Sequence, residues 1–392
     1  MLANPLRERL ASLGGGLRPL REPSPERRLP RGFEPVDTPW GTAWRLQEVH
    51  PIGRLPGTPP AIPFAYLDTE TTGLAGGSGT YAFTVALARP LPDRAGLEVV
   101  QLFLPEPSAE AAFLHLLQKE VAVSPAIGTY NGSRFDLPLL RTRWVMARLP
   151  GDFEHPDHLD LLTLTRSLLR QRLQSCALRN VEIRLLGFER EEDLPSAMVP
   201  DAYFAYLRRG WSPDLEGALA HNRQDVLSLY HLHSRLLLRL SGGDPHMEAA
   251  DWLALGRHLS RQGRRAEGWR SLRNAVEMSQ APASGLAGIL IARRLIRGGR
   301  ALSAARLLRS LFEREPEDPM LATALARVLE WKLRDPDAAL RVVERALSQH
   351  HLPQHRADLG RRRERLANRL TVRPRSRKPS ASLEERRPTA AP

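Results

Sequence analysis

Two carboxylates separated by a single residue stand at the end of an apolar run. The apolar stretch 64–67 leads into Asp68 and Glu70, and a Thr-Thr-Gly sequence follows. Because residues i and i+2 of a strand point to the same face, these two side chains would lie side by side. Carboxylates that close raise each other's pKa unless a cation lies between them. The pattern therefore predicts a buried strand that delivers metal ligands at or near its end.

Two further acids have a similar setting. Asp136 follows a short strand predicted over 126–130 and opens a helix. Asp225 lies inside an apolar helix, where aspartate is an unfavourable residue and an unpaired buried carboxylate is costly. His221 precedes it by one turn and lies on the same helix face.

Each acid also has a purely structural interpretation. Asp136 could cap the helix that starts near Leu137, and Asp225 could form a buried ion pair with Arg223 or Arg179. An Asp-x-Glu pair at a strand end also arises by chance. We favour a shared site because all four acids occur together, each at the end of an element or on a packed face.

The segments around these acids resemble the three motifs of the DEDD 3′–5′ exonucleases, which share a ribonuclease H-like fold. The motifs are Asp-x-Glu-Thr-Thr-Gly-Leu from Asp68, Tyr-Asn-Gly-x-x-Phe-Asp ending at Asp136, and His-Asn-x-x-Asp-Val-Leu-Ser-Leu from His221. The segment 158–206 makes the chain most similar to the bacterial YprB-like group. The likeness runs from about residue 36 to 240.

This resemblance implies that Asp68, Glu70, Asp136 and Asp225 bind metal and that His221 orients the attacking water or takes its proton. The metals would be two Mg²⁺ or Mn²⁺ ions, about 4 Å apart, that bridge the scissile phosphate. The family places tyrosine four residues, or histidine five residues, before the last acid. Here a histidine has the four-residue spacing, which still puts both groups on one helix face.

The resemblance also implies contacts with the substrate. Thr71 and Thr72 correspond to positions that meet the terminal nucleotide, and Asn131 would contact the substrate or fix its own loop. His158 and Asp160 form a further acid–base pair between the second and third motifs. We interpret this pair as a structural anchor because leucines surround it.

The order of predicted elements favours an α/β fold. Strands come first and then alternate with helices, which is typical of a mixed β-sheet flanked by helices, here a ribonuclease H-like one. Hydrophobic periodicity predicts strands at 42–46, 64–68, 80–89, 99–104 and 126–130, and helices at 110–120, 137–148, 161–173, 178–186, 200–209 and 215–240.

After a Gly-Pro-rich break at 241–245, the pattern of apolar residues changes to one that predicts short amphipathic helices. Three helical pairs with a period of about 34 to 37 residues resemble tetratricopeptide repeats, and a plain helical bundle is the alternative. We therefore expect four parts: a loose leader at 1–35, the exonuclease domain at 36–240, the helical domain at 246–350, and a basic, largely disordered tail at 351–392.

Composition restricts the class of protein. The chain has 392 residues and a net charge of +13, and 351–392 alone carries 12 basic against 4 acidic residues. Such a tail either binds a polyanion or is merely solvated. Cys176, the single cysteine, excludes an internal disulfide, is interpreted as structural and fits a reducing cytoplasm. No apolar run reaches the roughly 18 residues of a membrane span.

The sequence thus predicts a metal-dependent 3′–5′ exonuclease that acts on single-stranded or frayed DNA or RNA. The helical region 246–350 would recruit a protein partner, as repeat domains commonly do. The alternative is a weakly active or inactive nuclease fold that serves as a scaffold for nucleic acid and protein. The intact set of four acids favours the enzyme, because a nuclease fold that had lost its activity would be expected to lose at least one metal-binding residue.

Overall fold

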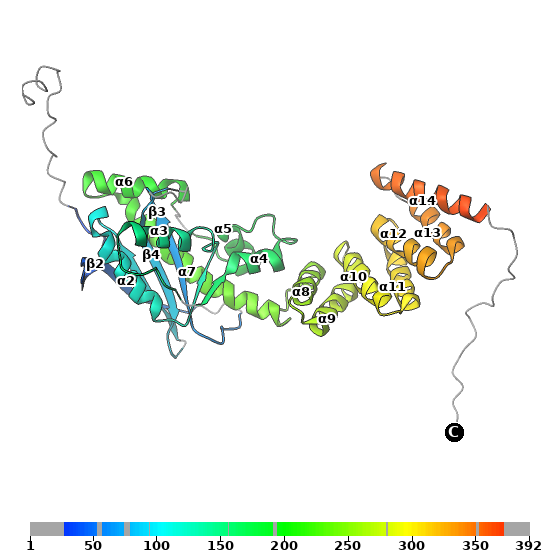
Figure 1. Cartoon of the computed structure of the whole chain (residues 1–392), viewed down its shortest axis with the longest axis horizontal. Helices are drawn as coiled ribbons and strands as arrows, with labels where there is room; N and C mark the ends of the chain where they lie inside the picture. The colour runs from blue at the N-terminus through cyan, green and yellow to red at the C-terminus, as the bar shows by residue number, and fades with distance from the viewer. Residues whose placement is uncertain are drawn as a thin grey trace, which may run out of the picture. The chain divides into compact units, whose positions relative to one another are not determined.

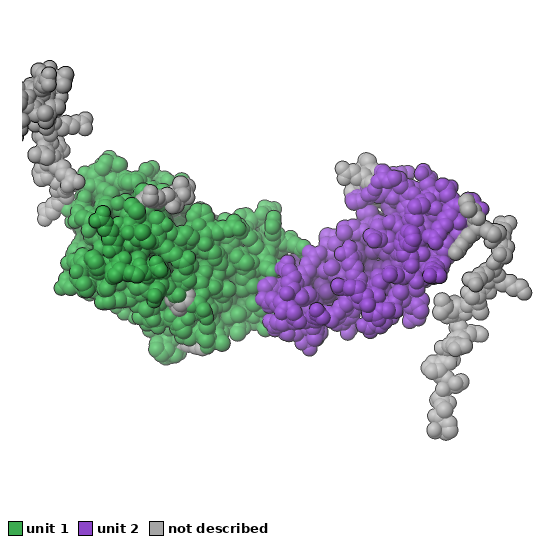
Figure 2. Space-filling view, viewed as in Figure 1, with its two compact units in different colours: residues 1–245 green, residues 246–392 purple. Residues whose placement is uncertain are grey.

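The computed structural model describes residues 27–371 apart from short gaps at 53–56, 74–78, 94, 156, 191–193, 280 and 350–352. It divides into two compact units, residues 1–245 and 246–392 (Figure 2). The division falls at the Gly-Pro-rich break. Most of the leader expected at 1–35, the centre of the loop that follows the Thr-Thr-Gly sequence, and residues 372–392 lie outside the described residues.

The first unit contains the expected mixed sheet, with seven strands in the order β1-β2-β5-β4-β3-β6-β7. The first five pair antiparallel along this order, whereas β6 and β7 continue parallel to β3. The strand β3 therefore lies where the sheet changes direction. The strands are β1 Glu34–Thr38, β2 Gly41–Pro51, β3 Phe64–Thr71, β4 Ala82–Pro90, β5 Gly96–Phe103, β6 Ala126–Thr129 and β7 Asp157–Asp160.

Helices cover both faces of this sheet (Figure 1). The longest, α7, has 28 residues and packs on β3 and β4, while α2 packs on the opposite face. The helices of this unit are α2 Glu110–Ala122, α3 Asp136–Met146, α4 Leu161–Leu169, α5 Leu178–Val181, a π-helical turn Glu182–Leu186, α6 Val199–Arg209 and α7 Pro213–Leu240.

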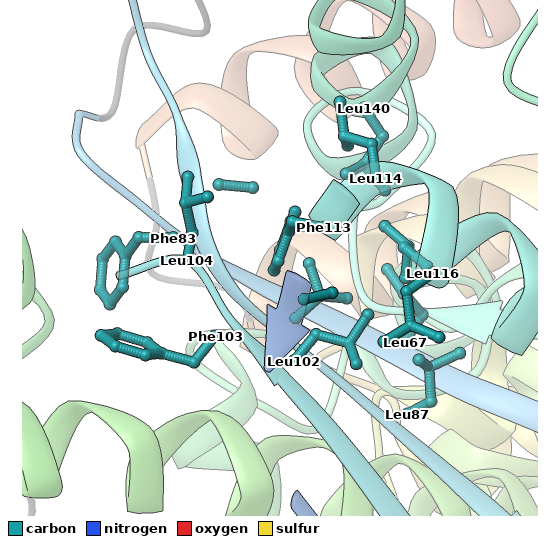
Figure 3. Close-up of a cluster of buried hydrophobic side chains, with 14 of the residues drawn as sticks. Leu67, Phe83, Leu87, Leu102, Phe103, Leu104, Phe113, Leu114, Leu116 and Leu140 are labelled. Carbon is teal, nitrogen blue, oxygen red and sulfur yellow. The ribbon is translucent and has the colours of Figure 1, made fainter. Parts of the chain in front are cut away.

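The alternation of β3 separates an apolar face from a functional face. Leu67 points toward α2 and joins a cluster with Leu87, Leu102 and Phe113 (Figure 3). Each of these four side chains is at most 1% exposed. Burial of a leucine or phenylalanine contributes roughly 1.5–3 kcal/mol, so this cluster fixes the register of the strand and thereby its other face.

The opposite face of the sheet carries small and polar residues under α7. In the register, Asp68 lies opposite Ala86, which lies opposite Gln101, and Glu70 lies opposite Thr84. The small side chain at position 86 leaves room for α7 beside the sheet. Gln101 donates its side-chain amide to the helix. The register therefore places both predicted ligands of β3 toward α7.

A buried hydrogen bond joins β3 directly to α7. The Tyr66 hydroxyl lies 2.9 Å from Nδ1 of His233, and both side chains are buried. Burial lowers the pKa of His233 to about 4, because the charged imidazolium loses its hydration. The histidine is therefore neutral in the folded protein at physiological pH.

This histidine is expected to make stability depend on pH. An unfolded histidine titrates near pH 6.5, so folding stability contributed by neutral His233 is present above that pH and is lost as pH falls toward about 4. One pKa unit is worth about 1.4 kcal/mol, so the full loss is a few kcal/mol. Urea unfolding at pH 7.5, 6 and 5 should show a smaller acid loss for His233→Gln than for the parent chain. Equal pH profiles for the two proteins would contradict this role.

The elements differ from the sequence prediction in several places, and the strand β1, which begins inside the expected loose leader, was not predicted. The strand β7 was not predicted, because four residues that lack a hairpin turn give almost no periodicity. The helix predicted at 161–173 ends at Leu169. The helix predicted at 178–186 is one α-turn followed by a π-turn, and it ends at Gly187 with φ 68°, the left-handed geometry expected of a glycine C-cap.

The second unit consists of helices alone within its described residues. The first helices of successive pairs begin at Ala249, Ala283 and Pro319, which gives spacings of 34 and 36 residues. The helical pairs are as expected, and their assignment to tetratricopeptide repeats stays a prediction. The helices are α8 Ala249–Arg261, α9 Arg265–Glu277, α10 Ala283–Arg297, α11 Ala301–Arg314, α12 Pro319–Arg327 with a π-turn Val328–Lys332, α13 Pro336–Gln349 and α14 Pro353–Thr371.

The helix α14 differs from the expected disordered tail. It is 19 residues long and packs on α13 (Figure 1). Leu359 and Leu366, two turns apart, are buried in the core of the unit at 1% and 0% exposure. The sequence did not predict this helix, because two leucines seven residues apart in an arginine-rich stretch give only a weak helical pattern. In the part of the chain described, no helix is long and apolar enough to cross a membrane.

Candidate functional site

The structure brings the end of β3 against the middle of α7. Glu70, His221 and Asp225 each offer a ligand atom, and these atoms lie within 4.8 Å of one another. The Nε2 atom of His221 is 3.7 Å from a carboxylate oxygen of Glu70 and 3.7 Å from one of Asp225. Three of the residues selected from the sequence thus meet in one cluster.

Asp136 reaches the site from α3. Its carboxylate accepts a 2.6 Å hydrogen bond from the hydroxyl of Thr69, the residue between the two acids of β3. The N-cap of α3 is Phe135, which makes no side-chain cap hydrogen bond. The capping role considered for Asp136 is therefore not the one the structure gives it. It lies against the strand instead.

The other three acids all act electrostatically on the carboxylate of Asp68. Burial raises its pKa well above the ordinary value, and the charges of Asp225, Asp136 and Glu70 raise it further. A hydrogen bond from Asn222 partly opposes them. Three acids that act together on a fourth, buried carboxylate form a site of strong negative potential, which a bound cation would stabilise.

The other two buried acids follow the same physics. Burial raises the pKa of Asp136 to about 6, although the Thr69 hydrogen bond lowers it. Burial also raises the pKa of Asp225, and the positive charge of Arg190 opposes that effect most strongly. All three carboxylates thus have a reduced tendency to ionise in the absence of a metal ion.

Arg190 is the internal counter-charge of this site. Its guanidinium donates to Asp225 and, at 2.6 and 2.9 Å, to both carboxylate oxygens of Glu182. Glu182 is fully buried in the π-turn. The side chain of Arg190 is itself only 6% exposed, so this is a buried ion-pair network in which each charge depends on its partners.

The same guanidinium determines the proton position on His221. An NH1 group of Arg190 lies 3.2 Å from Nδ1 of His221. Because guanidinium groups only donate hydrogen bonds, Nδ1 must be the acceptor, and the ring proton then lies on Nε2. Nε2 faces Glu70 and Asp225. In this arrangement the N–H group of His221 faces the acids from 3.7 Å, and no free ring lone pair faces them that could take a proton.

Asn222 connects the site to the sheet. It is fully buried, and its amide donates to the Asp68 carboxylate at 2.8 Å and to the Asp68 carbonyl at 3.1 Å. Its carbonyl accepts from Gln101 at 3.0 Å and from Thr84 at 3.4 Å. These bonds tie β3, β4, β5 and α7 together around one ligand, so Asp68 is held in a fixed orientation.

The loop residues predicted to contact substrate are engaged locally. The Thr71 hydroxyl donates to the Gly73 carbonyl at 2.9 Å, and the Thr72 hydroxyl accepts from the Tyr81 amide at 2.9 Å. Asn131 has a φ of 71°, and its backbone N–H donates to the carboxylate of Asp160 at 2.9 Å. These contacts fix the loops beside the site. Contact of these three residues with a nucleotide stays a prediction.

The pair between the second and third motifs is structural, as interpreted from the sequence. Asp160 caps α4 by accepting from Leu162 at 3.0 Å, and it also holds the loop at Asn131. His158 lies 2.8 Å from the Thr129 hydroxyl. Both residues therefore connect β7 to β6 and to the loop that precedes Asp136.

Sequence reasoning missed Arg190, Glu182 and the role of Asn222. The partner of Asp225 is Arg190, and Arg223, considered as a partner, instead donates to Gln101 at 2.7 Å. Arg190 stands in a polar stretch without periodicity, so no local signal distinguishes it from the other arginines. Asn222 did have a signal, because it is the second residue of the third motif.

The donor set fits hard divalent cations. Carboxylate oxygens with one imidazole are ligands of the kind that Mg²⁺ and Mn²⁺ accept. The raised pKa of Asp68, caused by burial and by three neighbouring acids, is the observation that argues for bound positive charge. Asp68, Glu70, Asp136 and Asp225 could hold it, and Arg190 supplies part of the compensation without a metal.

Comparison with known proteins agrees with this geometry. Residues 65–237 match the family described as the RNase_H superfamily. A relative from Bacillus subtilis (strain 168), named "Uncharacterized protein YprB", is 37% identical over 190 residues, which are 47% of this chain and 45% of the relative. This chain thus spans less than half of that relative's length.

Solved structures with partial similarity include the family B DNA polymerase from the hyperthermophilic archaeon Pyrobaculum calidifontis. It is 18% identical, with a TM-score of 0.37, over 63% of this chain and 33% of the polymerase. That score is too low to support a statement about function. The matched region 65–237 contains all four acids and His221. The first unit of this chain therefore has a ribonuclease H-like fold, and its match to the ribonuclease H superfamily spans the acidic cluster at the end of β3.

Proposed function

We propose that this chain is a metal-dependent 3′–5′ exonuclease that hydrolyses phosphodiester bonds at the end of single-stranded or frayed nucleic acid. The observation that carries the proposal is the convergence of acids at the end of β3: ligand atoms of Glu70 and Asp225 lie within 4.8 Å of each other and of His221, and Asp68 experiences electrostatic repulsion from its three acidic neighbours. Such repulsion is unfavourable in a protein without a function for it. It is the arrangement expected of a site that binds cations and, through them, a phosphate.

The acids and Asn222 have separate roles in the proposed reaction. Asp68, Glu70, Asp136 and Asp225 would hold two divalent cations, Mg²⁺ or Mn²⁺. When bound, these ions would withdraw charge from the scissile phosphate and stabilise the leaving 3′ oxygen. Asn222 keeps the Asp68 carboxylate oriented through its 2.8 Å hydrogen bond. Preorganised ligands need no rearrangement when the substrate arrives.

His221 orients the attacking water through its Nε2 proton. Its Nδ1 accepts from Arg190, which fixes the tautomer. A role as general base requires that Arg190 first leave Nδ1, and the bonds of Arg190 to Glu182 and Asp225 oppose such a movement. We therefore assign His221 the orienting role, the first of the two roles that its motif suggested.

Specificity for the 3′ end is supported by the likeness of the three motifs to 3′–5′ exonucleases. Thr71, Thr72 and Asn131 are the proposed substrate contacts. The hydrogen bonds that Thr71 and Thr72 make hold the loop after β3 in one shape. The helical unit, 246–350, is proposed to recruit a protein partner.

Matched oligonucleotides test the proposal. Full-length chain is incubated with 5′-labelled DNA and RNA of one sequence, with a free or a blocked 3′ end, in Mg²⁺, Mn²⁺ or EDTA. We expect a ladder of shortened products from free 3′ ends, only with a divalent ion, and none from blocked ends. Products from blocked ends at an equal rate would contradict the polarity. No products under any condition would favour the scaffold alternative.

A further inference from the structure

The positive charge of this protein is not in the unit that carries the acidic site. Residues 1–245 contain 27 basic and 28 acidic residues, whereas 246–392 contain 30 basic and 16 acidic residues. The first unit has no charge surplus with which to attract a polyanion. Any electrostatic attraction for nucleic acid must therefore come mostly from the second unit.

Within that unit, α14 presents a dense row of arginines. Pro353–Thr371 contains six arginines and two acids. Three of the arginines converge on Glu330, whose side chain is fully buried: Arg365 at 2.8 Å, Arg362 at 3.3 Å and Arg369 at 3.4 Å. One carboxylate neutralises only one of three guanidinium groups, so this anchored face retains a positive surplus.

An exposed aromatic ring lies beside this face. Trp331 is 59% exposed, although it stands in the middle of the π-turn Val328–Lys332. The guanidinium carbons of Arg365 and Arg369 lie 5.7 and 5.5 Å from its ring centroid. The two arginines leave more than half of Trp331 exposed to solvent, and π-turns are frequent at functional sites.

A cavity of about 570 Å³ borders the same tryptophan. Its floor is formed by buried apolar residues, with Leu308 and Val328, and its exposed rim is cationic, with Arg293, Arg327 and Lys332. The acid on the rim, Asp358, is paired with Arg361 of its own helix. An apolar hollow with a cationic rim and an exposed ring suits a ligand that has flat apolar faces and a repeating negative charge.

We infer that this surface, formed by Trp331, the cationic rim and the arginines of α14, binds single-stranded nucleic acid. A base stacks on Trp331 over the apolar floor, and the guanidinium groups contact the flanking phosphates. This combination of an aromatic platform with a cationic groove is how sequence-tolerant single-strand binding is achieved. The inference goes beyond hydrolysis at the acidic site, because it concerns binding by the second unit.

A solvated arginine face and a docking site for an acidic peptide both fit this surface less well. In a merely solvated face, the arginines would point separately into water. Here a buried glutamate draws three of them together beside an exposed tryptophan. An acidic peptide would match the charge, but its carboxylates have no flat apolar face to place on the exposed part of the Trp331 ring beside the arginines.

Binding is tested with the full-length chain in EDTA, which prevents metal-dependent cleavage. A labelled single-stranded oligonucleotide of about 20 nucleotides is titrated by fluorescence anisotropy over a range of NaCl concentrations. Trp331→Ala should weaken binding about tenfold, since stacking is worth about 1–3 kcal/mol per base. Trp331→Phe should restore most of the affinity.

Arginines that do not touch Glu330 test the electrostatic part without unfolding α14. The double variant Arg356→Ala/Arg363→Ala should lower the salt slope by about 1.4, because each phosphate contact on a single strand contributes about 0.7. The control, Arg270→Ala/Arg273→Ala, removes two exposed arginines from α9 and should leave the slope unchanged.

Two outcomes would overturn the inference. One is an equal loss of slope in the α9 control, which would indicate diffuse attraction only. The other is a labelled poly-glutamate peptide that binds as tightly as the oligonucleotide and loses affinity equally in Trp331→Ala. The assay needs no hydrolysis, so its result is independent of whether the acidic site is a nuclease.

Discussion

Replacement of Asp68 by asparagine is expected to stabilise the metal-free protein while removing its response to metal. Asparagine keeps the shape of the side chain but removes the charge that burial and three neighbouring acids disfavour at neutral pH. Relief of about 1 kcal/mol would raise Tm by about 2–4 °C. In the parent chain, Mn²⁺ should raise Tm because a ligand that binds only the folded state stabilises it. In Asp68→Asn that rise should disappear.

Thermal melts in EDTA and in Mn²⁺ measure both effects in one experiment. Asp37→Asn is the matched control, because Asp37 is an exposed carboxylate on β1. It should leave both melting temperatures at the parent values. A lower Tm for Asp68→Asn in EDTA would show that the Asp68 carboxylate stabilises the metal-free fold, and the site would then have no electrostatic need for a cation.

Removal of Arg190 should have the largest effect on stability. Arg190→Gln leaves fully buried Glu182 and the site residue Asp225 without their shared cation. Breaking one partner of a buried ion pair costs about 3–5 kcal/mol. The double variant Glu182→Gln/Arg190→Gln should recover a large part of this loss, because no charge remains buried in the π-turn.

Urea unfolding of both variants and of Glu182→Gln completes the cycle. Arg45→Gln is a suitable control: Arg45 is partly exposed and bonds Glu120 at 3.1 Å, while Glu120 keeps a second partner in Arg89 at 2.9 Å. It should cost less than about 1 kcal/mol. Purely additive effects of the Glu182 and Arg190 substitutions would contradict the network.

The acids of the site could be predicted because each has a local signature. Asp68 and Glu70 end an apolar strand, and Asp225 interrupts an apolar helix, so the unusual residue stands out against its neighbours. The sheet followed from the same periodicity. These patterns span only a few residues, and the periodicity of apolar residues predicts both the type of element and its buried face.

Arg190 and Glu182 could not be predicted in this way. Arg190 meets Asp225 across 35 residues of sequence, and its position depends on how the π-turn and the following loop close over α7. The helix α14 escaped prediction for a related reason. It is held by Glu330 from another element and by two leucines, and neither contact is visible in a polar, arginine-rich segment.

The most direct test of the proposed nuclease is the degradation of a 5′-labelled oligonucleotide by purified parent chain and by Asp225→Asn, each in Mn²⁺ and in EDTA. Loss of an outer-sphere partner of a metal ligand typically costs 10- to 100-fold, so loss of a ligand itself should cost at least about 100-fold. We expect a ladder of products from the parent chain in Mn²⁺ only, with Asp37→Asn equally active. Equal activity of Asp225→Asn and the parent chain, or activity that persists in EDTA, would contradict a metal-dependent nuclease at this site.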